Sequence, residues 1–305
     1  MSRGAALRTA VLLAAAIVPP RAAAQVAPPP AGPPLGVTGT IRFYGNFRSR
    51  DVAPRNVEVW LPPGYARDTT ARYPVLYLQD GQNVFDPATS YTGVDWGVDE
   101  TMTRLIAEHA VRPAIVVAIW NTPARFQEYM PQQALGTDSA FSSGVPGLGM
   151  VKGPALSDAY LRFMVEELKP FVDSAYRTRP GPSDTFVMGS SMGGLISLYA
   201  VMEYPQVFGG AACLSTHWPA ADGAFVTWLA GRLPPPASHR LYFDHGTETL
   251  DSLYAPYQAR VDAAGRAAGY TEGRNWISRV FPGADHSERS WRVRVAGPLV
   301  FLLGK

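Results

Sequence analysis

The fold is decided by residues 185–195, which read Thr185-Phe186-Val187-Met188-Gly189-Ser190-Ser191-Met192-Gly193-Gly194-Leu195. An apolar strand pattern runs directly into Gly-x-Ser-x-Gly, and a helical pattern follows at once. The turn is so tight that side chains two residues before and two residues after Ser191 would collide, and glycine is therefore required at positions 189 and 193. Such a turn lifts the Ser191 hydroxyl clear of a sheet, which predicts a nucleophile. Ser190 lies one residue outside the motif.

The same turn predicts an anion-binding group beside the nucleophile. It places the backbone N–H of Met192 at the start of a helix, where the first N–H groups have no partner within the helix. That N–H can donate to the oxyanion of a tetrahedral intermediate.

The predicted general base is His286. Where a nucleophile sits on this kind of turn, the acid and then the histidine follow it along the chain. His286 is the one histidine of five that lies beyond every candidate acid. It follows the strand-like run 276–280, and a loop at a strand's carboxyl end is where a base is delivered. The alternative interpretation is a histidine in a surface loop.

Three acids are candidates for the partner of His286. Asp244, Glu248 and Asp251 all follow or end the apolar run 241–243. We favour Asp251, with Glu248 second, because an acid there can reach sideways to the histidine and hold its tautomer. Asp285 is discounted because the side chains of adjacent residues diverge.

The rest of the chain predicts an α/β fold of the α/β-hydrolase type. Short continuous apolar runs, typical of strands buried on both faces, alternate with helical patterns. We therefore expect a mostly parallel central sheet with antiparallel strands at its N-terminal side and helices on both faces. The expected strands are 40–44, 56–61, 75–78, 114–119, 185–188, 209–214, 241–243 and 276–280, and the expected helices are 98–109, 157–172, 192–204 and 251–268.

The N-terminal residues predict export. A basic start, an apolar run over 10–18 and the small residues 22–24 are typical of a signal peptide, with cleavage just before Gln25. A retained N-terminal anchor is the alternative. The apolar run is too short to span a bilayer, so we expect no stable membrane insertion. Domains are thus predicted as a signal peptide (1–24), a Pro- and Ala-rich linker (25–35) and one hydrolase domain (36–305).

Composition excludes several classes of partner. Removing residues 1–24 leaves 24 of the 27 basic residues against 25 acidic ones, so nucleic acid is not an expected partner. The single cysteine, Cys213, lies in an apolar run and is predicted to be a core thiol. No metal-ligand spacing, dinucleotide fingerprint or P-loop is found, so neither a metal nor a cofactor is expected.

One segment has no periodic pattern. Residues 131–153 are rich in Gly and Ser and too long for a plain connection in a compact domain. We expect a flap or lid over a site.

These motifs resemble the putative-esterase family, which includes enterochelin esterases, bacterial feruloyl and acetyl-xylan esterases, the esterase D group and the mycolyltransferase antigens. The resemblance extends from about residue 57 to the C-terminus. It is carried by the runs 59–65, 77–86, 121–122, 125–129, 167–170, 176–178, 189–194 and 246–247, and by Asp251, His286 and Trp291.

The resemblance implies further site residues. Asp80-Gly81-Gln82 matches the loop that supplies a second oxyanion N–H, from Gln82, and Asp251 falls on the position of the acid. Asp80, Arg125, Glu128, Tyr129 and Trp291 are implied on the substrate side. For Arg125, Glu128 and Tyr129 the alternative is a salt-bridged loop, and for Trp291, like Trp96, it is filling of the core.

The sequence therefore predicts an exported serine ester hydrolase acting on a small-molecule or polysaccharide-linked ester. Two alternatives stay open. One is acyl transfer to a sugar or lipid alcohol, as the mycolyltransferase relatives perform it. The other is a non-catalytic member of the fold that binds a carbohydrate or a siderophore.

Overall fold

The structure is a computed structural model that describes residue 1 and residues 37–138, 140–145 and 149–304. The predicted signal peptide beyond Met1, its cleavage point and the predicted linker lie outside the described residues. Among the described helices, none has the length and apolar character that crossing a membrane requires.

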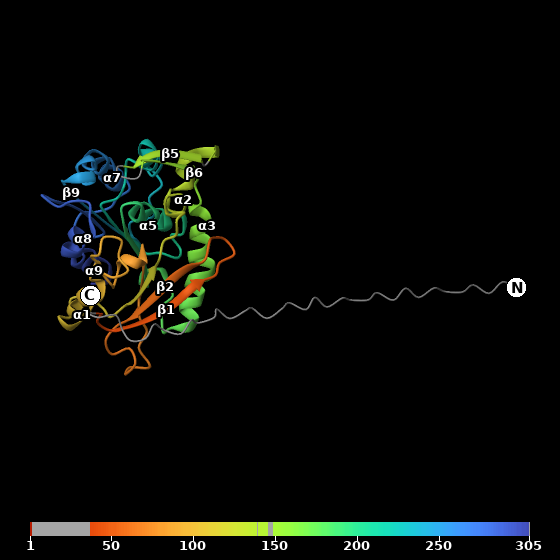
Figure 1. Cartoon of the computed structure of the whole chain (residues 1–305), viewed down its shortest axis with the longest axis vertical. Helices are drawn as coiled ribbons and strands as arrows, with labels where there is room; N and C mark the ends of the chain where they lie inside the picture. Colours follow the sequence, from red (N-terminus) through yellow and green to blue (C-terminus); the bar gives the residue numbers. More distant parts are fainter. Residues whose placement is uncertain (2–36, 139, 146–148, 305) are drawn as a thin grey trace.

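An eight-stranded sheet forms the centre of the molecule (Figure 1). β1 and β2 are antiparallel to each other, β2 is antiparallel to β4, and every other pair in the sheet is parallel. This confirms the predicted fold class. In spatial order the strands are β1 (Thr40–Phe47), β2 (Arg55–Leu61), β4 (Ile115–Ile119), β3 (Val75–Gln79), β7 (Thr185–Ser190), β8 (Gly210–Leu214), β9 (Arg240–Gly246) and β10 (Trp276–Phe281).

Helices cover both faces of the sheet, so successive side chains of the inner strands enter two different cores. Val187 of β7 packs into one core, whereas Phe186 and Met188 pack into the other. This is why the inner strands are apolar without alternation. Cys213 of β8 is also fully buried, as predicted.

The first core lies under α3 (Ser157–Arg162), the π-helical segment η3 (Phe163–Leu168), α4 (Lys169–Ala175), α5 (Met192–Glu203), α6 (Ala224–Trp228) and α7 (Ala255–Ala267). The second core lies under α1 (Val98–Ala107), α8 (Glu288–Arg294) and α9 (Ala296–Leu303). Figure 1 shows α1, α8 and α9 gathered on one side and α3 on the other.

Two predicted helices differ from the structure, in both cases at a proline. The run 157–172 is divided into α3, η3 and α4, because Pro170 has no N–H to continue the α-helical ladder. The run 251–268 begins as a short helix η6 (Thr249–Leu253), and α7 starts only at Ala255, with Pro256 in its first turn.

The aperiodic segment 131–153 contains regular structure. A short helix η2 (Gln132–Asp138) is followed by a hairpin of β5 (Ala140–Val145) and β6 (Gly149–Pro154). The hairpin packs next to α2 (Arg125–Tyr129) and the short helix η5 (Ala220–Gly223), which follows β8.

The order of the strands reverses at β3, which makes the carboxyl ends of β3 and β7 the switch point of the sheet. The chain moves from β3 outward to β4 and later returns to the other side of β3 as β7. The loops that leave the carboxyl ends of β3 and β7 therefore diverge, which is where open α/β sheets bind ligands.

A buried ion pair fixes α2 to the sheet. Both Nη atoms of Arg55 on β2 donate to the carboxylate of Glu128 on α2, at 3.0 and 2.6 Å, and both side chains are almost fully buried. The Arg55 guanidinium also lies 5.1 Å from the ring centroids of Tyr160 and Phe163. Because neither charged group is in contact with solvent, each is stabilised mainly by the opposite charge of its partner.

We expect Arg55→Met to lower the free energy of unfolding by about 3–5 kcal/mol, because Glu128 would remain buried without its counter-charge. Urea denaturation measures this loss. The double variant Arg55→Met/Glu128→Leu should regain most of it. If the double variant were as unstable as the single one, packing rather than charge would explain the loss.

Candidate active site

Ser191 lies in a strained turn between β7 and α5. Its backbone has φ 57° and ψ −123°, a conformation that is costly for a residue with a side chain. Its N–H donates to the Leu214 carbonyl at the end of β8. The Ser191 hydroxyl caps none of the first N–H groups of α5, so it is not used to hold the helix.

The two glycines of the motif are required by close backbone contacts. A Cβ atom at Gly189 would lie 2.5 Å from the Gly193 carbonyl oxygen. A Cβ at Gly193 would lie 3.2 Å from an oxygen of Asp80, in the loop after β3. The start of α5 thus packs directly against the loop after β3, and any side chain at Gly189 would separate β7 from α5.

The loop after β3 is held equally tightly. Asp80 is left-handed at φ 56°, and Gly81 begins a short helix, η1 (Gly81–Asn83). A Cβ on Gly81 would lie 2.6–2.8 Å from the backbone of Ala118 and Ile119 on β4. The loop therefore packs closely against the end of β4 and holds Gln82 at the carboxyl end of β3.

The two predicted oxyanion donors both have unused N–H groups. Met192 is the first residue of α5 and Gln82 lies in η1. Across residues 37–138, 140–145 and 149–304, neither backbone N–H has a hydrogen-bond acceptor. Unpaired N–H groups at the edge of a pocket can stabilise negative charge that develops on a substrate oxygen.

Asp80 anchors this loop to α2. Arg125 donates to both oxygens of Asp80, each at 2.7 Å, and the Asn121 side chain donates to one of them at 2.6 Å. The backbone N–H of Asn121 donates to the Gln82 side chain. Asp80 and Arg125 thus shape the loop that carries Gln82. Arg125 keeps about a fifth of its side chain exposed, so it can also face a ligand.

Glu128 and Tyr129 do not fit the substrate-side role that the resemblance implied. Glu128 is 1% exposed and is occupied by Arg55 and by the Thr122 hydroxyl. Tyr129 is fully buried, and its hydroxyl accepts the N–H of Asp80 at 3.4 Å. Both residues support the loop from within the core, which agrees with the alternative of a salt-bridged loop.

The structure pairs His286 with Asp251. Nδ1 of His286 lies 2.6 Å from Oδ1 of Asp251. An ionised carboxylate can only accept, so Nδ1 carries the hydrogen and Nε2 is the basic nitrogen. His286 follows β10 in the chain, and Asp251 lies in η6, which follows β9.

Asp251 is held by three donors. Its second oxygen accepts the Ser215 hydroxyl and the Gly246 N–H, both at 2.6 Å. Burial alone would raise the pKa of Asp251, but these hydrogen bonds and the one with His286 lower it below its ordinary value. Asp251 therefore stays ionised although its side chain is fully buried.

The loop that carries His286 is fixed to the loop after β9. A Cβ on Gly246 would lie 2.0 Å from the Ala284 carbonyl oxygen, which also accepts the N–H groups of Thr247 and Glu248. The hydroxyl of Thr249 accepts the backbone N–H of His286 at 2.9 Å. Asp251 and His286 are thus positioned by contacts between the same two loops.

The other candidate acids are placed elsewhere. Glu248 is exposed and interacts with the neighbouring Thr247 hydroxyl. Asp285 accepts the hydroxyls of Ser287 and Ser290, both at 2.5 Å. Asp244 is buried and pairs with Arg294. Of the four acids considered, the structure brings only Asp251 to His286.

A second histidine, His217, which the sequence did not single out, lies between the segments that carry Ser191 and His286. Its backbone N–H donates to the Ser191 backbone carbonyl, and its side-chain Nδ1 lies 2.9 Å from the Tyr254 hydroxyl. The Tyr254 ring in turn packs edge-on against His286. Burial, with the nearby charges of His286 and Arg125, lowers the pKa of His217 to about 4, so this histidine is neutral. No hydrogen bond joins Ser191 to His286 among the described residues, so that pairing belongs to the proposal below.

Trp291 packs against His286 from the core side. It is 4% exposed, its ring packs edge-on to His286 at 5.1 Å, and its Nε1 donates to Ser215 at 3.0 Å. Trp96 packs against its other side at 5.5 Å. Core filling, the alternative considered for both tryptophans, describes these contacts. Ser215 was missed, although its position directly after β8 is a signal that could have identified it.

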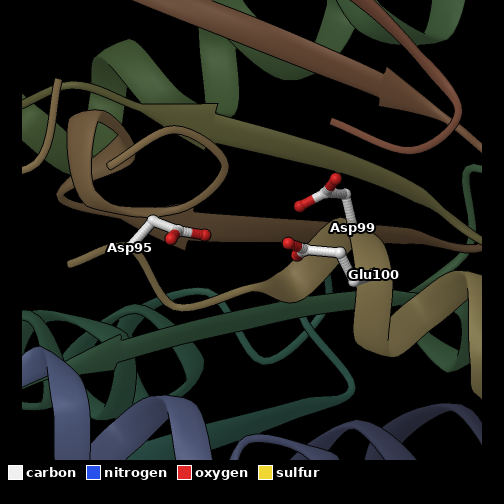
Figure 2. Close-up of side chains that lie close together, drawn as sticks. All are labelled: Asp95, Asp99 and Glu100. Carbon is white, nitrogen blue, oxygen red and sulfur yellow. The ribbon is translucent and has the colours of Figure 1, made fainter. Parts of the chain in front are cut away.

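A cluster of three carboxylates lies near the start of α1 (Figure 2). Oxygens of Asp95, Asp99 and Glu100 lie within 4.8 Å of one another, which is compatible with a cation site. The positive charge beside them is that of Arg292, which donates to Asp95 at 2.6 Å and to Glu100 at 3.1 Å. Asp99 is fully buried, and one oxygen of Asp99 and one of Glu100 have no partner among the described residues. Because the Asp99 and Glu100 carboxylates lie so close together, they are suited to sharing one proton.

Burial, reinforced by Glu100, raises the pKa of Asp99 from 3.8 to about 7. The folded protein then binds more protons than the unfolded chain between these pH values, so this group makes stability fall as pH rises from about 4 to 7. We expect Asp99→Asn to remove this pH-dependent loss. Between pH 5 and pH 8, the free energy of unfolding of the variant should rise relative to that of the wild type by on the order of 1 kcal/mol. Chemical denaturation at several pH values measures the difference. Parallel pH profiles for the two proteins would contradict the assignment.

Comparison with known proteins identifies relatives along most of the chain. The family model described as "Putative esterase" matches residues 52–301. The uncharacterized protein YbbA of Bacillus subtilis (strain 168) is 22% identical over 270 residues, which cover 86% of this chain and 97% of that protein.

Solved structures share the fold. A ferulic acid esterase superposes with a TM-score of 0.64 at 18% identity, covering 87% of this chain and 98% of the other. The enterobactin esterase FES from Shigella flexneri, solved in the presence of enterobactin, also gives a TM-score of 0.64, at 20% identity, covering 88% of this chain and 59% of the other.

Proposed function

The chain belongs to the "Putative esterase" family and is a carboxylic ester hydrolase, and from this premise we propose that it acts through a serine acyl-enzyme. Ser191 is the nucleophile, His286 the general base and Asp251 the acid that orients it. The observation that carries the proposal is the 2.6 Å contact of His286 with a buried Asp251, at the sheet edge where Ser191 sits in its strained turn.

The reaction proceeds in two steps. In the first, the Ser191 oxygen attacks the ester carbonyl carbon while its proton passes to Nε2 of His286. The oxyanion is stabilised by the backbone N–H groups of Met192 and Gln82. His286 then gives the proton to the departing alcohol, and the acyl group remains bonded to Ser191.

In the second step, His286 removes a proton from water, which attacks the acyl carbonyl. Collapse of this intermediate releases the carboxylic acid and returns the proton to Ser191. The charge on His286 appears only when it holds the proton, next to the ionised Asp251. The site is thus suited to the charge distribution of the transition state rather than that of the resting enzyme.

We expect Ser191→Ala and His286→Ala to lower kcat for 4-nitrophenyl acetate by about 10⁴-fold or more, because each removes a group that takes part in bond making or proton transfer. Asp251→Asn should cost roughly 10³–10⁴-fold, since the amide favours the wrong tautomer of His286. The measurement is steady-state hydrolysis, with melting temperatures to confirm folding.

Glu248→Gln is the matched control for the acid. Glu248 lies three residues from Asp251 but is exposed, so its amide variant should keep near wild-type kcat. A larger loss in Glu248→Gln than in Asp251→Asn would show that the acid is misassigned. Full activity in Ser191→Ala would overturn the mechanism.

The structural neighbours suggest which esters to test. Methyl ferulate and enterobactin are the probes indicated by the ferulic acid esterase and the enterobactin esterase. Including an alcohol acceptor in the same assays distinguishes hydrolysis from acyl transfer, because a transferase would convert the acceptor into a new ester. A wild type that binds these compounds without turnover would favour a non-catalytic binding role.

We further propose that the protein is exported, on the basis of the basic, apolar and small-residue pattern in residues 1–24. When the full chain is expressed in a bacterium, the mature protein should be recovered outside the cytoplasm with Gln25 at its N-terminus. N-terminal sequencing of each cell fraction tests this. An intact N-terminus on cytoplasmic protein would contradict it.

A further inference from the structure

Two buried carboxylates near the base share one guanidinium. Arg294 of α8 donates from Nε to Asp244 of β9 at 3.0 Å, and its Nη2 lies 3.8 Å from Oδ2 of Asp251. The side chains of all three residues are at most 3% exposed. The positive charge of Arg294 is therefore placed between the acid that holds His286 and a second acid that the mechanism does not use.

Ser215 connects Arg294 to the catalytic acid. Its oxygen accepts from Arg294 Nη2 at 2.7 Å and from Trp291 Nε1 at 3.0 Å. Both partners are donors only, so the hydroxyl hydrogen of Ser215 must point to Asp251, 2.6 Å away. The backbone N–H of Ser215 donates to the carbonyl of Asp244, which joins the second acid to the same network.

The charges of this network balance only during catalysis. Two carboxylates and one guanidinium leave a net charge of −1 while His286 is neutral, and the sum becomes zero when His286 holds the proton of Ser191. Without Asp244, Arg294 would neutralise Asp251 and leave no negative charge for the imidazolium. Buried charges are weakly screened, so this difference acts directly on the proton transfer.

We propose that Asp244 is a positioning residue for catalysis, which offsets the charge of Arg294 so that the charge of Asp251 remains available to His286. Asp244 touches neither the substrate nor the reacting atoms and acts through Arg294 and Asp251. The inference rests on the proposed serine mechanism.

The titratable groups around this network differ in whether they carry a charge. Burial raises the pKa of Asp244 to about 6, against the opposing effect of Arg294, so Asp244 is ionised at pH 8. His217, which faces His286 from the loop after β8, is neutral. Burial raises the pKa values of Tyr242 on β9, Cys213 on β8 and Tyr254 after η6, so these three groups are neutral at pH 8. Hydrogen bonds lower the pKa of Asp285 beside His286, so its carboxylate is ionised, but it is unchanged in every variant of the test. The same holds for the exposed Arg279 of β10, which lies opposite Asp244 in the strand register.

The test compares kcat/KM against pH for the wild type and Asp244→Asn. Asparagine keeps the shape and an acceptor for Arg294 but removes the charge. We expect the acidic limb of the profile to move to lower pH by about one unit, and the rate at pH 8 to fall roughly tenfold, because the imidazolium is less stabilised. Active-site titration of Ser191 with a fluorophosphonate corrects the rates for the folded fraction.

The double variant Asp244→Asn/Arg294→Gln provides the decisive control. It removes one charge of each sign and restores the net charge of −1, so its acidic limb should return toward that of the wild type. If the role of Asp244 were merely structural, kcat/KM of the double variant would be at least as low as that of Asp244→Asn. The acidic limb of the pH profile would then stay in its wild-type position in both variants.

The outcomes separate the two levels of proposal. An unmoved limb in Asp244→Asn, in an enzyme that depends on Ser191, overturns the role of Asp244 and leaves the proposed function intact. A wild type that hydrolyses esters no faster than Ser191→Ala overturns the serine mechanism, and with it the basis of this inference.

Discussion

The close contact between the end of β7 and the start of α5 is the constraint on which the site depends. With glycine at 189 and 193, the backbone can turn within one residue and hold Ser191 at a positive φ. The same contact presses α5 against Asp80 in the loop after β3. One steric requirement therefore positions Ser191, the proposed nucleophile, together with the Met192 N–H and the loop that carries Gln82.

The order of the strands turns this local contact into a site. Because β7 returns next to β3, the loops after these two strands diverge, and β8, β9 and β10 follow on one side. The loops after these last three strands bring Ser215, Asp251 and His286 to the same edge. Residues from three separate loops of the chain thus meet because parallel strands present their carboxyl ends together.

Below this surface, the site is organised by buried charges. Arg125 holds Asp80, Arg55 holds Glu128, and Arg294 lies between Asp244 and Asp251. Buried pairs of this kind contribute little net stability compared with apolar packing. Their effect here is to fix the orientation of loops and to set the local charge, which catalysis requires more than stability does.

Much of the protein was determined by the sequence alone. The glycines on either side of Ser191 predict a tight turn, and the uninterrupted apolar runs predict a sheet covered on both faces. The order of residues along the chain favours His286 as the proposed base. These features are local or follow from chain order, so they can be recognised without coordinates. Asp251 could be favoured in the same way but not separated from Glu248.

Tertiary structure alone decided which side chains share a space. It placed Asp251 rather than Glu248 against His286, moved Glu128 and Tyr129 into the core, and joined Ser215, Asp244 and Arg294 into one network. Such pairings depend on strand register, on how far a loop projects and on which face of a helix is buried. Charge, burial and hydrogen-bond partners are properties of those contacts, and a single sequence does not contain them.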